Sequence, residues 1–286
     1  MNSPPRTNTV FTRRAPGDTG AAVRRLAELA AEAEITVRVP EDEVVKHGLS
    51  DLPGVELGAD PDGLTDLAVV MGGDGTILTA MRRYAGRDVP VFAINFGAIG
   101  FLATVERDGL DDAVKRALTG EFEVLRLPAL AVATSSGEYL AVNDISFHRR
   151  QDLRVAELGY SVVGAKLGEV RCDGLVVATP AGSTGYNLAN GGPVMAWGVQ
   201  GYVVSFIAPH TLTARALVVA PDDLLRVDNR SDEEPVDVTT DGRQVCTLGP
   251  RESVEVRFRD GMTQLAQVGG ASFYNRLRDK FGRLSY

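Results

Sequence analysis

The residues best suited to chemistry lie in one glycine-rich turn, Gly72-Gly73-Asp74-Gly75-Thr76. An apolar run from Leu67 to Met71 precedes the turn, and a helix-like spacing of apolar residues begins at Ile77. Glycines let backbone N–H groups crowd around an anion, and a helix start adds unpaired N–H groups and the positive end of the helix dipole. The turn therefore predicts a phosphate site with four phosphate-binding residues, Gly72, Gly73, Gly75 and Thr76.

The carboxylate of Asp74 does not suit a phosphate site, because two anions repel each other. Its position in the middle of the turn therefore indicates a chemical or metal-linked role. The alternative is an ordinary strand-to-helix turn in which Asp74 caps the helix. Three glycines at the carboxyl end of a buried parallel strand count against that alternative, since ligands of open α/β sheets bind there.

Two later motifs have the groups needed to recognise a nucleotide. Asn143-Asp144 interrupts an apolar stretch, and an amide beside an acid can bind ribose hydroxyls, although such a pair is more often a β-turn. The segment from Asp173 to Asn187 runs from a strand through Pro180-Ala181-Gly182 to hydroxyl groups at a helix start and then to Tyr186. Tyr186 could stack on a base or, alternatively, lie in the core.

The remaining candidates carry weaker signals. His210 could be catalytic, but a loop histidine bonded to the backbone is the simpler interpretation. Asp241-Gly242-Arg243 predicts a hairpin turn. Neither His47 nor His148 has a partner that the sequence identifies.

Two kinds of secondary structure must position these residues. Over residues 1–121 strands alternate with helices, which predicts right-handed βαβ units and a Rossmann-like α/β phosphate-binding domain. Over residues 122–268 short β-branched segments separated by turns predict a larger β-sandwich-like domain. An amphipathic helix within residues 269–286 is expected to return and pack on the first domain. The fold class is therefore α/β plus all-β.

The opening of the chain is harder to interpret. Residues 1–9 are rich in proline, asparagine and threonine and are expected to fray. A helix is predicted from Asp18 or Thr19 to Glu34, followed by a strand over residues 35–39. The acidic segment 41–65 is interpreted as a helix fragment and a loop.

Composition narrows the possible partners and location. The net charge of −8 and pI of about 5.0 argue against nucleic acid or an anionic membrane as the main partner, so phosphates must be held locally. Only Cys172 and Cys246 occur, which is too few for a disulfide framework or a zinc site. The chain has no apolar run of transmembrane length and a polar start without a signal-peptide core. These features predict a cytoplasmic protein.

Taken together, the motifs resemble those of the NAD kinase family. They follow that family's order over most of residues 65–280, and the first motif alone is shared with lipid kinases and phosphofructokinases. The matching segments are Gly72–Thr76, Asn95–Leu102 as N-x-G-x-x-G-F-L, Asn143-Asp144, Thr179–Tyr186, Gly191-Gly192-Pro193 and Pro209–Leu212. Residues 1–64 resemble a shortened or divergent form of the family's opening strand and helix.

The resemblance implies an enzyme that phosphorylates the adenosine 2′-hydroxyl of NAD to give NADP, using Mg²⁺ and either ATP or polyphosphate. Asp74 corresponds to the general base, and no protein ligand of the metal is assigned. It further implies a homodimer or homotetramer. The NAD-binding residues implied are Asp74, Gly75, Asn143, Asp144, Asp173, Thr184, Gly185, Tyr186 and Asn187.

Four positions depart from the family pattern, namely Asp144 for a commoner Glu, Ala181 for Thr or Ser, Gly185 for Ala and Arg243 for Gln. None of them removes the base, but they leave affinity and dinucleotide preference open. Two alternatives therefore stand beside NAD kinase. One is a catalytically weak or silent NAD(P)-binding regulator, and the other is a lipid or sugar kinase that shares the glycine turn.

Overall fold

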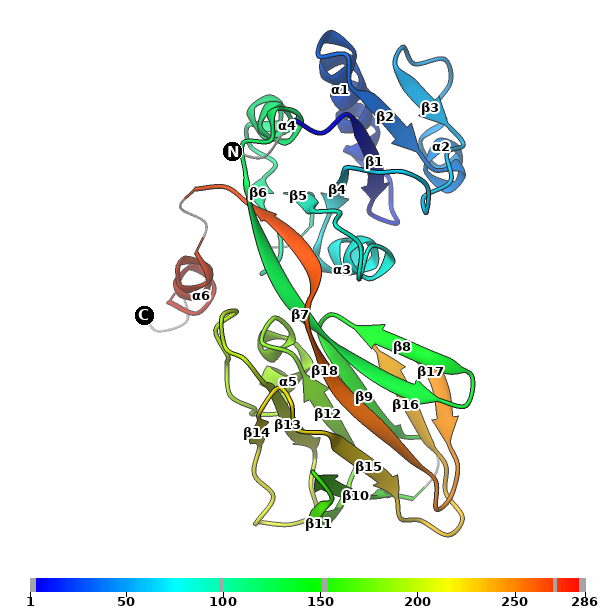
Figure 1. Cartoon of the computed structure of the whole chain (residues 1–286), viewed down its shortest axis with the longest axis vertical. Coiled ribbons are helices and arrows are strands. Elements are labelled where there is room, and N and C mark those ends of the chain that lie inside the picture. The colour runs from blue at the N-terminus through cyan, green and yellow to red at the C-terminus, as the bar shows by residue number, and fades with distance from the viewer. Residues whose placement is uncertain (1–3, 98–99, 151–153, 270–271, 283–286) are drawn as a thin grey trace. The chain divides into compact units, whose positions relative to one another are not determined.

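A computed structural model describes residues 4–97, 100–150, 154–269 and 272–282 of the 286-residue chain. The chain divides into two compact units, residues 1–126 with 263–286, and residues 127–262 (Figure 1). It passes from the first unit to the second within strand β7 (Glu123–Thr134) and returns within β18 (Ser253–Gln267). The predicted division at residue 121 lies just before this crossing.

The first unit is built on a parallel sheet with the strand order β3-β2-β1-β4-β5. The strands are β1 (Thr7–Thr12), β2 (Thr36–Val39), β3 (Val55–Leu57), β4 (Leu67–Gly72) and β5 (Val91–Asn95), with a short β6 (Val105–Glu106) beside β5. The chain builds outward from β1 in one direction and then resumes at β4 on the other side of β1. The carboxyl ends of β1 and β4 therefore form a topological switch point, where open α/β sheets bind ligands.

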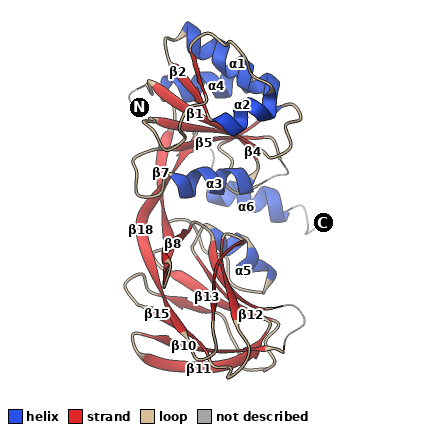
Figure 2. Cartoon of the chain, turned by 90° about the vertical axis from the view of Figure 1, so that its right-hand side faces the viewer, coloured by secondary structure: helices blue, strands red, loops and turns tan. Residues whose placement is uncertain are grey.

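Helices cover both faces of this sheet, as the alternating pattern predicts. The helices are α1 (Thr19–Glu32), α2 (Glu41–His47), α3 (Asp74–Arg83), α4 (Leu110–Thr119) and the C-terminal α6 (Phe273–Phe281). Helices α1 and α4 lie on one face and α3 and α6 on the other (Figure 2). The apolar stripe of α1, including Val23, Leu26 and Ala30, is buried in the core against β1, β2 and β4.

The expectation that residues 1–9 fray is wrong for the part that the structure describes. Strand β1 is the centre of the sheet, and both Asn8 and Thr9 are fully buried. The Thr9 hydroxyl lies 2.6 Å from that of Thr65, which satisfies one of these polar groups. Pairing with β2 on one side and β4 on the other makes a strand of a segment whose polar residues give no alternating signal, because strand preference depends on context.

The second unit contains two antiparallel sheets, which confirms the β-sandwich-like prediction. One sheet has the order β14-β13-β12-β9-β16-β17, and the other joins β11, β10, β15 and β18, with β7 and β8 at its far side. The two sheets share one hydrophobic core, which includes Phe147 from the first sheet and Leu158 and Val227 from the second. The strands not yet placed are β8 (Gly137–Ala141), β9 (Asp144–Arg149), β10 (Ala156–Val162), β11 (Ala165–Cys172), β12 (Gly174–Ala178), β13 (Tyr202–Ile207), β14 (Leu217–Val219), β15 (Leu225–Asn229), β16 (Val236–Thr240) and β17 (Arg243–Leu248).

The C-terminal helix returns to the first unit, as the sequence predicts. Its Phe273 and Phe281 rings pack beside Phe101, with ring centroids 6.4 and 6.1 Å away. The Lys280 ammonium lies 4.3 Å from the centre of the same ring. Among the described residues, no helix combines the length and the apolar character needed to cross a membrane.

Candidate active site

The Asp74 carboxylate begins α3 and is held by the backbone of the loop that follows β5. Its Oδ2 accepts a hydrogen bond from the Phe101 N–H at 2.9 Å, and its Oδ1 accepts one from the Leu102 N–H at 3.2 Å. A Cβ atom on Gly100 would lie 2.0 Å from Oδ1 of Asp74. The glycine is therefore required by the close approach of the carboxylate, and the backbone of Phe101 and Leu102 positions Asp74.

The same loop is anchored by Arg276 of α6. The guanidinium donates to the carbonyl oxygens of Phe101, at 2.9 Å, and of Ala103, and to Oε1 of Gln267 at 3.0 Å. Burial lowers the pKa of Arg276, while the negative charge of Asp74 opposes that shift. The C-terminal helix thus supports the loop whose N–H groups hold Asp74.

The glycine turn has the backbone geometry of an anion site. The Thr76 and Ile77 N–H groups donate to the Gly73 carbonyl at 2.9 and 3.2 Å, which starts the helix. The earlier N–H groups, those of Asp74 and Gly75, have no partner within the helix. Gly72 has no room for a side chain, because a Cβ atom there would lie 2.6 Å from the Thr76 hydroxyl.

A pocket of about 520 Å³ lies at the switch point of the first unit. The glycine turn forms one wall, and the end of β1 and the helix α2 form another. Its volume is within the range of small-molecule sites. The lining residues are Phe11, Thr12, Arg14, Asp42, Glu43, Lys46, Gly73, Asp74, Gly75, Thr76 and Thr79.

The first unit offers few protein ligands for a metal ion. Over the described residues, no group of three or more His, Cys, Asp or Glu side chains could hold one. Mg²⁺ in phosphate sites needs only one or two carboxylates, since phosphates and water complete its shell. Each oxygen of Asp74 accepts one N–H and keeps further lone pairs, so this carboxylate fits a metal that arrives with the donor phosphates.

In the second unit the Asn143-Asp144 turn is held by a third residue, Asp241. Its carboxylate accepts hydrogen bonds from three successive N–H groups, those of Val142 at 3.0 Å, Asn143 at 2.7 Å and Asp144 at 3.1 Å. Asp241 and Gly242 have φ of +45° and +74° and join β16 to β17, so the predicted hairpin turn is confirmed. The role of the Asp241 carboxylate was not predicted, because Asp is common in such turns for local reasons alone.

Asp144 is a buried carboxylate, only 7% exposed. Burial, with a smaller effect from the charge of Asp241, raises its pKa from 3.8 to about 7. The side-chain oxygen of the adjacent Asn143 is also buried, without a hydrogen-bond partner among the described residues. This turn therefore presents polar groups that its own protein surroundings leave incompletely satisfied.

The Thr179–Tyr186 segment packs directly on that turn. The Thr179 N–H donates to the Asn143 carbonyl at 2.9 Å, and the Thr179 hydroxyl donates to the Val142 carbonyl at 2.7 Å. A Cβ atom on Gly182 would lie 2.0 Å from the Asn143 carbonyl oxygen, so only glycine fits. The structure thus brings the second and third sequence motifs together.

The side chains of this segment differ in their accessibility. Tyr186 is 37% exposed and stacks on His148 at 5.6 Å, which rules out a core role. Gly185 is exposed, and the Thr184 hydroxyl donates to the Ala181 carbonyl at 3.3 Å. Asn187 is fully buried, and its amide donates to the Ser183 and Pro193 carbonyls at 2.9 and 3.0 Å. The Asn187 side chain therefore supports the loop from inside.

Two further candidates lie at the surface of the second unit. The Asp173 carboxylate accepts from Nε of Arg149 at 2.6 Å, and both side chains are partly exposed. His210 is exposed, and its backbone N–H donates to the Arg171 carbonyl at 2.8 Å. Asp173 is therefore available to a ligand, and among the described residues His210 has no side-chain partner that would make it a base.

Comparison with known proteins covers residues of both units. Residues 22–122 match the ATP-NAD kinase N-terminal domain, and residues 142–268 match the ATP-NAD kinase C-terminal domain. The NAD kinase of Syntrophotalea carbinolica is 35% identical over 225 residues, which cover 77% of this chain and 79% of that protein. The chain belongs to the NAD kinase family.

Further relatives support this membership. The NAD kinase of Gemmatimonas aurantiaca is 34% identical over 76% of this chain and 77% of its own length. The fold is similar to that of yeast NADH kinase complexed with NADH, with a TM-score of 0.88, 21% identity, and 99% and 89% of the two chains covered. It is also similar to an NAD kinase from Archaeoglobus fulgidus in complex with ATP, with a TM-score of 0.71, 24% identity, and 97% and 98% covered.

Membership of the NAD kinase family makes the chain a phosphotransferase. It disfavours both a silent regulator and a lipid or sugar kinase, which would share only the glycine turn. The glycine turn and the two later motifs were predictable from the sequence, whereas Arg276 and the contribution of β1 and α2 to the pocket were not. The polar opening of the chain and a single arginine in the last helix carry no local signal for these roles.

The close contact at Gly100 gives a test of how Asp74 is held. We expect Gly100→Ala to lower kcat by about 10²-fold, because a displacement of about 1 Å at the reacting groups can cost that much. NAD affinity, measured by calorimetry, should stay within a few-fold of wild type. Gly198→Ala is the matched control, since its Cβ atom would meet no heavy atom within 4 Å. A wild-type kcat in Gly100→Ala would show that the carboxylate does not need this position.

The raised pKa of Asp144 predicts a pH-dependent stability. A carboxyl group whose pKa is higher in the folded state binds its proton more tightly there, so the free energy of unfolding falls as pH rises from about 4 to about 7. The shift corresponds to at most about 4 kcal/mol. We expect Asp144→Asn to be more stable than wild type at pH 8 and similar at pH 4, in urea unfolding.

The exposed Asp222→Asn variant is the control for this measurement, since its carboxylate lies in solvent. Its free energy of unfolding should follow that of wild type at both pH values. An Asp144→Asn variant that is equally stable, or less stable, at pH 8 would contradict the assignment of a destabilising buried carboxylate.

Proposed function

We propose that the chain transfers the terminal phosphoryl group of ATP, or of polyphosphate, to the adenosine 2′-hydroxyl of NAD, with Asp74 as general base. The observation that carries the proposal is the fixed position of the Asp74 carboxylate beside the glycine turn. The curated relatives are NAD kinases, and the two similar solved structures are complexes with NADH and with ATP.

The glycine turn is proposed to receive the donor phosphates through backbone N–H groups and the N-terminus of α3. Phosphoryl transfer passes through a loose transition state, so position and charge neutralisation contribute more than nucleophilic push. Asp74 orients the acceptor hydroxyl and takes its proton, and this general-base catalysis raises the reaction rate by about 10²–10⁴-fold. Mg²⁺ bound with the donor, near Asp74, would supply neutralising charge.

The second unit is proposed to bind NAD. Asn143 and Asp144 hold ribose hydroxyls, and at neutral pH Asp144 can act as donor or acceptor, because its pKa is about 7. The exposed ring of Tyr186, with Thr184 and Gly185, holds adenine, and Asp173 lies near the nicotinamide amide. Asn187 contributes indirectly, since its buried amide supports the loop that carries these residues.

We also propose a cellular location, an oligomeric state and small-molecule partners for the enzyme. Cys172 and Cys246 are both free thiols, as expected for a protein of a reducing cytoplasm. A homodimer or homotetramer that forms NADP for biosynthesis is the arrangement that the family resemblance implies. NAD and a nucleoside triphosphate are the proposed small-molecule partners.

Asp74→Asn tests the role of the base. This variant keeps the shape of the side chain and one of its two acceptor oxygens, so it can accept from only one of the Phe101 and Leu102 N–H groups, and it cannot take a proton at neutral pH. We expect NAD affinity to stay within a few-fold of wild type and kcat to fall by about 10²–10⁴-fold. Calorimetry with NAD and a chromatographic assay of NADP formation measure the two quantities.

The control is Asp260→Asn, which changes an exposed carboxylate and should leave both quantities unaltered. Wild-type enzyme should phosphorylate NAD but neither diacylglycerol nor fructose 6-phosphate, with MgATP and polyphosphate tested as separate donors. A near-wild-type kcat in Asp74→Asn would remove the assigned base. A wild type that forms NADP from no donor would refute the proposed reaction.

A further inference from the structure

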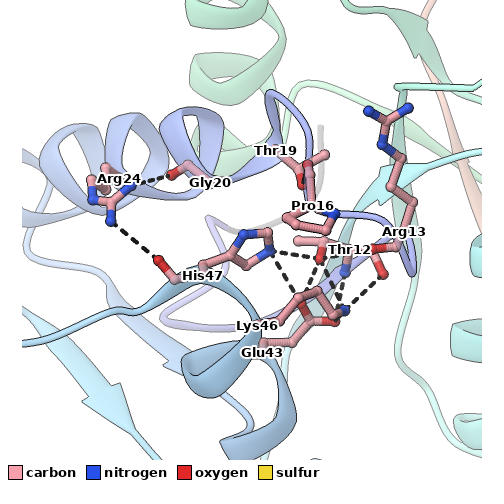
Figure 3. Close-up of polar contacts among 9 residues, drawn as sticks. All are labelled: Thr12, Arg13, Pro16, Thr19, Gly20, Arg24, Glu43, Lys46 and His47. Atoms are coloured by element: carbon pink, nitrogen blue, oxygen red, sulfur yellow. Dashed lines mark hydrogen bonds and ion pairs between the residues drawn. The ribbon is translucent and has the colours of Figure 1, made fainter.

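One wall of the pocket at the switch point is not formed by the glycine turn. That wall consists of the end of β1 and one face of α2, and it carries a cluster of Thr12, Glu43, Lys46 and His47 (Figure 3). Thr12, Glu43 and Lys46 line the pocket together with Gly73–Thr76. A charged cluster therefore lies in the same pocket as the proposed phosphate-binding turn.

Glu43 is the centre of this cluster and is only 3% exposed. One carboxylate oxygen accepts from the Thr12 N–H at 2.8 Å, and the other accepts from the Thr12 hydroxyl at 2.5 Å. Lys46 lies one helical turn along, and its ammonium is 2.8 Å from Glu43 Oε1. A buried carboxylate is costly unless it is paired and hydrogen-bonded, and here it is both.

His47 completes the cluster from the last turn of α2. Its side chain is 1% exposed, and Nε2 lies 2.8 Å from the Thr12 hydroxyl. Burial lowers the pKa of His47, which favours the neutral ring, while the charge of Glu43 opposes that shift. Because the Thr12 hydroxyl donates to Glu43, the His47 Nε2–H donates to that hydroxyl.

Lys46 is held in place but remains accessible. Its side chain is 19% exposed, and besides Glu43 it makes two longer contacts, 3.3 Å to the Thr12 carbonyl and 3.2 Å to the Thr12 hydroxyl. Both longer contacts of Lys46 are with Thr12. Phosphate oxygens can replace these two contacts while the Lys46 ammonium keeps its contact with Glu43. A lysine ammonium has three donors and acts on phosphate as a point charge.

The glycine turn needs such a cation. It contains no lysine or arginine, and Asp74 adds a negative charge to a pocket that Asp42 and Glu43 also line. The two cationic side chains that line the pocket are Arg14, which is exposed, and Lys46, which is fixed by the cluster. Lys46 is therefore the positive charge that the fold itself positions opposite the turn.

We propose that Lys46 binds the phosphate chain of the donor, whether a nucleoside triphosphate or a linear polyphosphate, and that Glu43 and Thr12 position its ammonium. This inference rests on the proposed kinase function, because it places the donor in this pocket. The competing explanation is a purely structural ion pair that joins α2 to β1. The two explanations differ in what removal of the charge does to donor binding.

The experiment compares Lys46→Met with Lys115→Met, which removes an exposed lysine from α4 outside the pocket. We expect Lys46→Met to raise KM for MgATP about tenfold or more and to leave KM for NAD within about twofold, since one charge-assisted contact of about 1.4 kcal/mol is a factor of ten. Calorimetry with tripolyphosphate should show a similar loss of affinity. Lys46→Arg, which keeps the charge, should recover much of it.

Glu43→Gln separates positioning from folding. It keeps an oxygen that can accept from Thr12 but loses the charge that holds Lys46. We expect a higher KM for MgATP and for polyphosphate, a lesser change in kcat, and no change in KM for NAD. A structural pair would instead lower the melting temperature and the yield of active enzyme, and would leave the donor KM of the folded fraction unaltered. That result would overturn the inference.

Wild-type protein provides a measurement that does not depend on variant folding. Tripolyphosphate or MgATP should protect Lys46 from amine acetylation, followed by mass spectrometry, with Lys115, Lys166 and Lys280 as internal references. Equal acetylation with and without both probes would overturn the inference. If wild type forms no NADP but tripolyphosphate still protects Lys46, the proposed reaction fails while the phosphate contact stands.

Discussion

The proposed active site of the first unit depends on how the Asp74 carboxylate is held at the end of β4. Asp74 stands beside N–H groups that suit phosphate, so its position has to be fixed by something other than the anion site. Two N–H groups of the loop after β5 hold the carboxylate, and Gly100 has no side chain because that carboxylate occupies its space. Arg276 then secures the loop from α6, so the last helix of the chain supports the first motif.

Charge is the second constraint on this unit. The chain carries a net charge of −8, and the pocket itself contains three carboxylates, so a phosphate donor cannot be attracted by an overall basic field. Backbone N–H groups at a helix start can supply part of the positive charge that a phosphate donor requires, because they carry partial positive charge without a cation. In the proposed site a lysine fixed by a buried glutamate supplies further positive charge, and this lysine comes from α2 and not from the turn.

The second unit shows the energetic cost of a buried carboxylate at its proposed binding surface. Asp144 is buried beside Asp241, a placement that favours its neutral form and lowers stability as pH rises. Asp241 is needed there because its carboxylate accepts three backbone N–H groups and so shapes the turn that presents Asn143 and Asp144. Sites for ligands commonly keep such strain, since the same groups would be better satisfied in solvent.

Much of this protein was predictable from sequence, because periodicity and glycine turns are local signals. The alternation of helices and strands, the β-rich second unit, the returning helix and the residues of the glycine turn all follow from neighbours in the chain. The central strand β1 did not, because its burial comes from β2 and β4 on either side of it. The Arg276 anchor, the Asp241 bridge and the Glu43–Lys46 pair were also decided only by tertiary structure. The Arg276 and Asp241 contacts join residues far apart in the chain. Glu43 and Lys46 are close in sequence, but only the tertiary structure shows that they face the pocket.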